Sequence, residues 1–314
     1  MEQVRRNSVK AWLLAARPKT LSGASVPVMI GASMAWHDAM SDFRWVAALL
    51  CFLFAFIMQI DANFVNDYFD FRRGNDDKNR LGPRRACAQG WITLPAMRLG
   101  IVLTTFLACV VGLPLVLFGG WTLVLVGVVC VVFCFLYTTS LSYLGLGDVL
   151  VLVFFGIVPV TLTYYVSMPE GAQAISSRVF LASIACGCVI DTLLVVNNYR
   201  DRDNDARAGK KTLVVRIGAA NSERLYWCLG FMAILANSFL FLVMETGVSI
   251  VTRLWCVLTL VIVYGGLHDH AYRRMRTLRQ GKALNAILGK TARNMFFYGV
   301  LVSAAYIVIS VFSR

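Results

Sequence analysis

The sequence predicts an all-α, polytopic membrane protein with nine transmembrane helices. Hydrophobic residues make up 58% of the 314-residue chain and charged residues only 15%, whereas a soluble domain is nearer half apolar and a quarter charged. Uncharged runs recur with the length of roughly 20 residues that a membrane-spanning helix needs. Basic residues gather between alternate runs. Together these observations exclude an ordinary soluble globular protein, a disordered tail and a fibrous repeat.

The uncharged runs give the nine spans in order. Residues 99–147 carry no charge. This run is too long for one helix and suits two, and we expect the break near Pro114 and the Gly119–Gly120 pair. The other predicted spans are residues 20–36, 45–65, 149–169, 179–199, 225–244, 254–267 and 294–313.

The distribution of positive charge predicts the orientation of the chain. There are 30 Lys and Arg against 17 Asp and Glu, a net charge of +13. Of the 30, 26 lie in the N-terminal segment or follow the second, sixth or eighth span, and short loops rich in Lys and Arg stay in the cytoplasm. We therefore expect an inner (plasma) membrane protein with its N-terminus inside and its C-terminus outside. Nucleic acid is the usual partner of so basic a chain, but the apolar content favours the lipid bilayer, and we expect no nucleic-acid partner.

Two segments of the chain share one polar layout. Residues 66–70 read Asn-Asp-Tyr-Phe-Asp, and residues 197–201 read Asn-Asn-Tyr-Arg-Asp. A basic loop with a glycine follows each: Arg80-x-Gly82-x-Arg84 after the first and Arg207-x-Gly209-x-Lys211 after the second. We interpret segments 61–85 and 191–213 as an internal repeat within a single membrane-embedded domain, residues 1–314.

The repeated segments predict a metal and phosphate site at the cytoplasmic ends of two spans. Residues three or four apart share a helix face, and carboxylates packed so densely need a cation between them. Mg²⁺ takes carboxylate oxygens and is usually shared with substrate phosphates. The candidate metal ligands are Asn63, Asp67, Asp70, Asn198, Asp201 and Asp205, and the four aspartates are also the candidate catalytic residues. The candidate diphosphate-binding residues are Arg84, Arg85, Arg200, Lys210 and Lys211.

The sequence leaves the roles of other acidic residues open. Asp76, Asp77 and Asp203 suit a solvated loop with weak ion pairs as well as they suit a site. Asp61 and Asp191 fall deeper in their spans, where an ionised side chain costs roughly 2.5–3.5 kcal/mol on insertion scales and is a functional candidate by default. Protonation, or pairing with a neighbouring Asn or Arg, explains these two equally well, and the sequence assigns them no role.

The polar segments resemble the UbiA-type intramembrane prenyltransferases. Asn66-Asp67-Tyr68-x-Asp70 followed by Arg80-x-Gly82-Pro83-x-Arg85 is similar to the branch that prenylates 1,4-dihydroxy-2-naphthoate in menaquinone synthesis. Three further stretches resemble that branch: Arg17-Pro18-Lys19-Thr20-Leu21, Tyr143 to Asp148, and Gly209-Lys210-Lys211-Thr212-Leu213. At position 148 the branch is expected to carry Glu more often than Asp.

The resemblance implies nine helices around a central cavity, closed at its cytoplasmic mouth by polar loops. It implies two Mg²⁺ ions that bridge the metal ligands to a polyprenyl diphosphate, and an aromatic acceptor that contacts Arg17, Lys19, Asn66 and Tyr68. Attack by the carboxylate-bearing carbon of the acceptor, with loss of CO₂, would give demethylmenaquinol. Aromatic faces that could stabilise the allylic cation are Phe64, Tyr68, Tyr137, Tyr164 and Tyr199.

Two alternatives stay open from the sequence. The same chemistry could act on another aromatic acceptor, such as 4-hydroxybenzoate or homogentisate, because the aspartate motifs do not distinguish acceptors. A secondary transporter also uses repeats and an ion site near the bilayer midplane. The crowding of the acids at the cytoplasmic ends, next to basic loops, favours a phosphate ester as the substrate.

Overall fold

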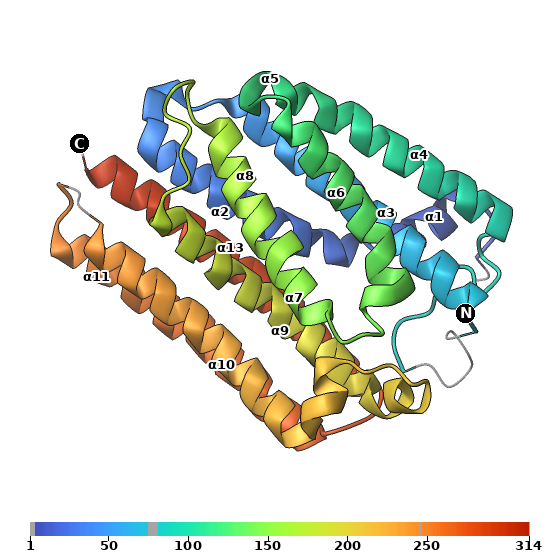
Figure 1. The fold of residues 1–314 in the computed structure, drawn as a ribbon. Helices are drawn as coiled ribbons and strands as arrows, with labels where there is room; N and C mark the ends of the chain where they lie inside the picture. The colour runs from blue at the N-terminus through green and yellow to red at the C-terminus, as the bar shows by residue number, and fades with distance from the viewer. Residues whose placement is uncertain (1–3, 75–80, 245–246, 314) are drawn as a thin grey trace.

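The computed structural model describes residues 4–74, 81–244 and 247–313, with the side chain of Lys19 excluded. Within these ranges the chain is helical and contains no strand, which confirms the predicted fold class. Figure 1 shows a bundle of long helices with the two termini at opposite ends. The helices are α1 (Val9–Ala16), α2 (Leu21–Ala39), α3 (Trp45–Arg72), α4 (Leu94–Gly112), α5 (Val116–Gly119), α6 (Thr122–Leu136), α7 (Gly147–Val151), α8 (Val158–Ser167), α9 (Ser177–Arg207), α10 (Leu213–Val243), α11 (Ile250–Thr259), α12 (Gly266–Leu278) and α13 (Leu284–Phe312).

Eight continuous helical segments among the described residues are long and apolar enough to cross a membrane. They are Trp45–Arg72, Leu94–Gly119, Thr122–Leu141, Gly147–Ser167, Ser177–Arg207, Leu213–Val243, Ile250–Leu278 and Leu284–Phe312. Each coincides with one of the expected spans. The first expected span corresponds to α2, a 19-residue helix packed against α13 and α8 that is not among the eight. The count of nine, and the orientation, therefore stay predictions.

Three π-helical segments interrupt or extend the spans. They are η4 (Tyr137–Leu141) after α6, η5 (Leu152–Ile157) between α7 and α8, and η6 (Leu260–Gly265) between α11 and α12. The expected break inside residues 99–147 occurs at Gly120, whose φ of 81° suits glycine because it has no Cβ. π-Bulges are frequent at functional sites, and two of these three flank the cavity described below.

The centre of the bundle is α9, which packs against α2, α8, α10 and α13. Its close approach to η5 depends on two glycines. A Cβ on Gly156 would lie only 2.6 Å from Gly187 Cα, so neither position has room for a side chain. In contrast, α6 has no buried residue. The loose packing of α6 leaves space between it and the α2, α3 and α8 side of the bundle.

Hydrogen bonds inside the bundle explain one deep acid. Asp61 is fully buried in α3, and its two carboxyl oxygens accept hydrogen bonds from the hydroxyl groups of Thr104 (2.5 Å) and Thr105 (3.1 Å) of α4. Polar contacts between neighbouring helices stabilise membrane bundles. Asp61 therefore has a structural partner, and it ties α3 to α4.

At the end of the bundle opposite the polar segments, another acid joins neighbouring helices. Asp38, at the end of α2, accepts from Arg178 of α9 at 2.6 Å and from the Tyr164 hydroxyl group of α8 at 2.6 Å. This cluster joins three helices. The polar ends of α3 and α9 lie at the other end of the bundle, where the loops connect (Figure 1).

Candidate functional site

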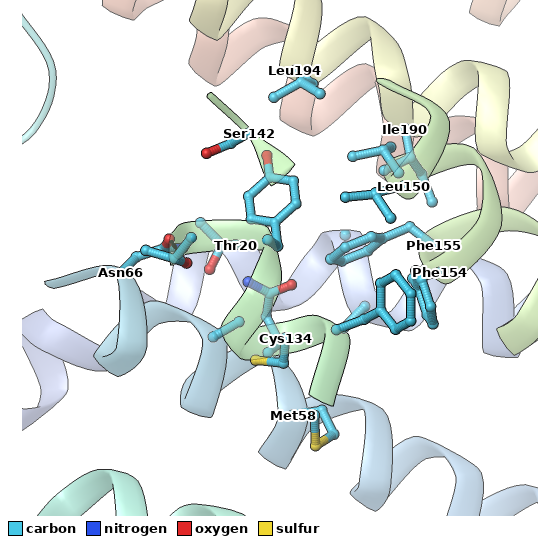
Figure 2. A pocket seen from close by; sticks show the side chains of 18 of the residues that line it. Thr20, Met58, Asn66, Cys134, Ser142, Leu150, Phe154, Phe155, Ile190 and Leu194 are labelled. Carbon is cyan, nitrogen blue, oxygen red and sulfur yellow. Dashed lines mark hydrogen bonds between the residues drawn. The ribbon is translucent and has the colours of Figure 1, made fainter. Parts of the chain in front are cut away.

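A cavity of about 2080 Å³ runs into the bundle from the end that carries the two polar segments. Its lining is polar at the mouth and apolar further in. Figure 2 shows Asn66 and Thr20 on one side of the cavity and Phe154, Phe155 and Ile190 on the other. The charged and amide residues of the lining include Arg17, Asn66, Asp70, Arg84, Arg85, Asn197, Asn198, Asp201, Asp205, Lys210 and Asn285, and the deeper apolar residues include Phe54, Met58, Cys134, Phe133 and Phe154.

The first polar segment divides its side chains between the cavity and the surrounding protein. Asn66 and Asp70, one turn apart on α3, line the cavity. Asn63 and Asp67 form the neighbouring stripe, and both are buried. The Asp67 carboxyl oxygens accept from the backbone N–H groups of Ala86 (2.8 Å) and Cys87 (3.0 Å). Asp67 thus holds the loop that carries the basic residues.

Asn63 is bound to the N-terminal segment. Its side-chain amide donates to the Ala16 carbonyl oxygen at 2.9 Å and to the Thr20 hydroxyl oxygen at 3.0 Å. These contacts position the turn at Arg17, which has a left-handed backbone with φ of 51° and lines the cavity. The metal roles of Asn63 and Asp67 stay predictions, and in this structure both side chains hold the walls of the site.

Basic residues from the first loop reach the mouth of the cavity. Arg85 is buried and its guanidinium donates to Asp70 at 3.0 Å. Arg84 lines the same mouth. Arg80, Asp76 and Asp77 lie outside the described residues. A carboxylate and a guanidinium in contact at an entrance can exchange partners when a phosphate and a cation arrive, because a guanidinium binds phosphates as well as carboxylates and a carboxylate binds Mg²⁺.

The second polar segment is organised around a buried arginine. Arg200 is 2% exposed and does not line the cavity. Its guanidinium forms a bidentate contact with Asp201 and donates to Asn197 and Asn285, both at 2.9 Å. Asn285 in turn donates to the Leu81 carbonyl oxygen at 2.7 Å. Arg200 therefore holds α9, α13 and the first loop together behind the lining.

Asp205 and Lys210 complete the second half of the mouth. Asp205 Oδ1 lies 3.8 Å from the Lys210 ammonium, and its buried Oδ2 has no hydrogen-bond partner among the described residues. Lys210 also lies 5.8 Å from the ring of Tyr143, and Arg73, the residue that follows α3, lies 5.0 Å from the same ring. One tyrosine therefore stands between cations of the two segments. Lys211 is exposed and contributes its backbone N–H to the Tyr143 carbonyl oxygen.

The candidate acceptor-binding residues are also divided between the cavity lining and the surrounding protein. Arg17 and Asn66 line the cavity, and Asn66 accepts from the Thr138 hydroxyl group of η4. Tyr68 is buried beside Arg72 and Phe69 instead, and Lys19 has no described side chain. Of the five aromatic residues considered for the cation, Tyr137 lines the cavity. The four in buried clusters are Phe64, Tyr68, Tyr164 and Tyr199.

The donor set at the mouth fits Mg²⁺. Over the described part of the chain no three His, Cys, Asp or Glu side chains stand close enough to hold a metal by themselves. The available donors are hard oxygens, from Asp70 on one side and Asp201 and Asp205 on the other, and the unpartnered Asp205 Oδ2 is one of them. Mg²⁺ usually binds through one or two carboxylates together with water and substrate phosphates. A site completed by the substrate is consistent with this arrangement.

Sequence patterns missed several residues of the site. Asn285 and Thr138 stand alone in their segments, so no spacing marked them. Asn197 and Tyr143 belong to the sequence motifs, but the motifs assigned neither of them a role. Asn197 could have been identified because it is the residue equivalent to Asn66 in the repeat, and both line the cavity.

Known proteins with similar sequences and folds were found for this chain. The model of the UbiA prenyltransferase family matches residues 24–311. The chain is 35% identical to the 1,4-dihydroxy-2-naphthoate octaprenyltransferase of Escherichia coli over 73% of this chain and 75% of that protein. It is 33% identical to the Mycobacterium leprae protein of the same name over 95% and 96% of the two chains.

A solved structure shares the fold. A UbiA homolog from Archaeoglobus fulgidus bound to DMAPP and Mg²⁺ superimposes with a TM-score of 0.60 at 14% identity, over 93% of this chain and 99% of that one. The family model covers all but the ends of the described bundle, including both polar segments. The chain belongs to the UbiA prenyltransferase family.

Proposed function

We propose that this protein transfers a polyprenyl group from polyprenyl diphosphate to 1,4-dihydroxy-2-naphthoate, with loss of CO₂, to give demethylmenaquinol. The observation that carries the proposal is one continuous cavity with a charged mouth and an apolar interior. A polyprenyl diphosphate has the same division between an anionic head and a hydrocarbon tail. The names of the Escherichia coli and Mycobacterium leprae relatives supply the acceptor.

The proposed metal is Mg²⁺, in keeping with the ligands of the Archaeoglobus fulgidus homolog. Bound Mg²⁺ would neutralise negative charge on the leaving diphosphate. Asp70, Asp201, Asp205 and Asn198 line the cavity and are proposed to hold the ions directly. For Asn63 and Asp67 we propose the same chemistry at the edge of the site, together with their observed role in holding the loops.

The basic residues are proposed to bind the diphosphate from both sides of the mouth. Arg84 and Arg85 approach from the first loop and Lys210 from the second. Charged donors fixed around the leaving oxygens stabilise the transition state more than the ground state, because negative charge grows there as the bond breaks. Arg200 would act indirectly by fixing Asp201, and the exposed Lys211 would meet the diphosphate only after the loop rearranges.

The apolar part of the cavity is proposed to protect the allylic cation. Phe133, Phe154 and Phe155 line it, and a site without bulk water prevents hydrolysis of a reactive intermediate. The acceptor is proposed to bind near Arg17 and Asn66, and Lys19 and Tyr68 stay candidate contacts for it. We also propose that the protein lies in the cell inner membrane, with its N-terminus and this mouth facing the cytoplasm, because 26 of the 30 Lys and Arg lie in the N-terminal segment or follow the second, sixth or eighth expected span.

The test uses protein purified in detergent, Mg²⁺, a long polyprenyl diphosphate and carboxyl-labelled 1,4-dihydroxy-2-naphthoate. We expect labelled CO₂ and a lipid-soluble naphthol in equal amounts, and neither product after EDTA treatment. Prenylation of 4-hydroxybenzoate without release of CO₂ from the naphthoate would disprove the acceptor and retain the metal site. Absence of turnover with every aromatic acceptor would disprove the transferase proposal as a whole.

A further inference from the structure

Two acids next to the cavity have buried carboxyl oxygens without a hydrogen-bond partner among the described residues. Asp191, in the middle of α9, is 6% exposed, and its Oδ1 is one of these atoms. Both carboxyl oxygens of Asp148, in α7, belong to the same set, although Asp148 as a whole is half-buried. α7, which carries Asp148, packs against α9, which carries Asp191, and no hydrogen bond joins the two carboxyl groups in the described part of the chain. Asp61, the third deep acid, differs because two threonines bind it.

Residues beside this pair, Asp148 and Asp191, also line the large cavity. Asp148 lines a space of about 10 Å³, roughly the room that one water needs. Tyr137 and Lys210 line both this small space and the large cavity. A methyl group placed on Gly147 would lie 3.9 Å from the Tyr137 hydroxyl oxygen, so that hydroxyl group reaches the residue beside Asp148.

The ionisable groups that face the pair come from three elements. Tyr137 of η4 borders the small space together with Asp148, and it lines the large cavity together with Asp70 and Asp205. Cys188 lies one turn before Asp191 on α9, so the two side chains share a helix face. Lys210 borders the small space but pairs with Asp205 at 3.8 Å. Among the described residues, none of these groups forms an ion pair with Asp148 or Asp191.

Such an arrangement is unfavourable for stability. A buried carboxyl group without a partner loses its hydration and gains nothing in return, and a second one beside it adds repulsion. Of two neighbouring acids in this position, one is most easily kept neutral while the other ionises. Ionisable residues inside a membrane protein are functional candidates for this reason.

We propose that Asp148 and Asp191 together hold the proton that the aromatic acceptor gives up during prenyl transfer, and that Tyr137 passes it between the cavity and the pair. This inference rests on the proposed function. In the first step the carbon–oxygen bond of the prenyl diphosphate breaks and its electron pair leaves with the diphosphate. The carboxylate-bearing carbon of the acceptor forms the new carbon–carbon bond. The neighbouring hydroxyl group becomes a carbonyl, and its proton moves through Tyr137 to the pair.

The second step returns the proton. CO₂ leaves, and the electron pair of the broken carbon–carbon bond makes the carbonyl oxygen an enolate. The enolate oxygen takes the proton back through Tyr137, which restores the aromatic diol. No proton is consumed overall, so a closed pair of carboxyl groups without access to bulk water is sufficient. Asp148 and Asp191 are positioning residues in this scheme, and Tyr137 is the group that meets the acceptor.

The proposal predicts opposite effects of one substitution on stability and on turnover. Asp148→Asn and Asp191→Asn keep the shape of each side chain and remove a buried charge that has no partner. We expect thermal midpoints at or above that of the wild type. General acid–base groups contribute about 10²- to 10⁴-fold to rate, so we expect CO₂ release at least about 100-fold slower in either variant. Protection of each variant from heat by Mg²⁺ and a non-hydrolysable prenyl diphosphate analogue should remain as in the wild type.

A conservative variant and a pH profile separate proton transfer from packing. Asp148→Glu keeps the carboxyl group and should retain turnover, whereas Asp148→Asn should not. The wild-type rate should fall at low pH as the pair becomes fully protonated. In Asp148→Asn the pH of this fall should change, because Asp191, which is more deeply buried than Asp148, is then the only acid of the pair left to ionise.

Three results would overturn the proposal. One is near-normal CO₂ release by both Asn variants. Another is loss of the analogue's protective effect together with turnover, which would mean that the site had collapsed. The third is a pH profile of Asp148→Asn that is identical to the profile of the wild type. If the wild-type protein prenylated only another phenol, the proposed acceptor would be wrong. The same variants would then be assayed with that phenol, because it must also release a proton.

Discussion

Replacing Asp67 distinguishes a side chain that fixes a loop from a side chain that only binds the substrate. Its carboxylate accepts hydrogen bonds from two buried backbone N–H groups, those of Ala86 and Cys87. In Asp67→Ala both amides lose their partner. A buried donor left unsatisfied costs about 1–3 kcal/mol, so two cost about 2–6 kcal/mol of local stability. Since 1.4 kcal/mol is a factor of ten, the lower bound predicts that these amides exchange with deuterium at least about 30-fold faster.

The assay is hydrogen exchange followed by mass spectrometry on peptides that cover residues 81–93, in detergent and without substrate. Asp205→Ala is the matched control, because in the described ranges one oxygen of the Asp205 carboxylate has no hydrogen-bond partner and the other lies 3.8 Å from Lys210. Both variants should lose turnover, but only Asp67→Ala should exchange faster in this loop. Unchanged exchange in Asp67→Ala would refute the argument that this side chain fixes the basic loop.

Further predictions concern the metal, the tail and the far end of the bundle. Asp201→Ala should abolish turnover and the protection by Mg²⁺ and a prenyl diphosphate analogue; protection that persists contradicts its metal role. Gly127→Phe should favour shorter prenyl diphosphates in competition assays, because Gly127 lines the cavity and a Cβ there meets nothing within 4 Å. Gly266→Phe, equally unobstructed but outside the cavity lining, is its control, and an equal change in both would refute the assignment. Asp38→Asn should lower stability by about 2 kcal/mol in thermal unfolding, because it weakens the contact with Arg178, and a changed KM for either substrate would contradict a purely structural role.

The composition and charge pattern predicted the helical class because a membrane restricts the possible structures so strongly. Backbone groups in lipid must be satisfied within the protein, so long apolar segments become helices. The break at Gly120 was predictable for a similar local reason. The π-helical segments η4, η5 and η6 were not, since a π-bulge depends on how neighbouring helices meet rather than on a local residue pattern.

The candidate site was predictable to the level of segments and less so to the level of side chains. The repeat located both polar helix ends, and both line the cavity. Sequence spacing could not say which of two adjacent helical stripes faces inward, because Asn66–Asp70 and Asn63–Asp67 have the same spacing. That choice depends on the rotation of α3, which packing against α4 and α2 determines. Arg200 and Asn285 needed contacts between distant segments, and no single-sequence pattern contains them.

The packing of the bundle and the chemistry of the cavity have one common cause. On one side α9 is buried between helices that approach closely at Gly156 and Gly187, and it holds Asp191 and Asp201 in fixed positions. On the other side α6 has no buried residue, although its residues line much of the cavity. A tightly packed helix suits groups that must keep their geometry while charge moves. A loosely packed helix suits a hydrocarbon tail, because apolar side chains can shift around it without breaking hydrogen bonds. We therefore expect substitutions on α9 to change rate and substitutions on α6 to change tail preference.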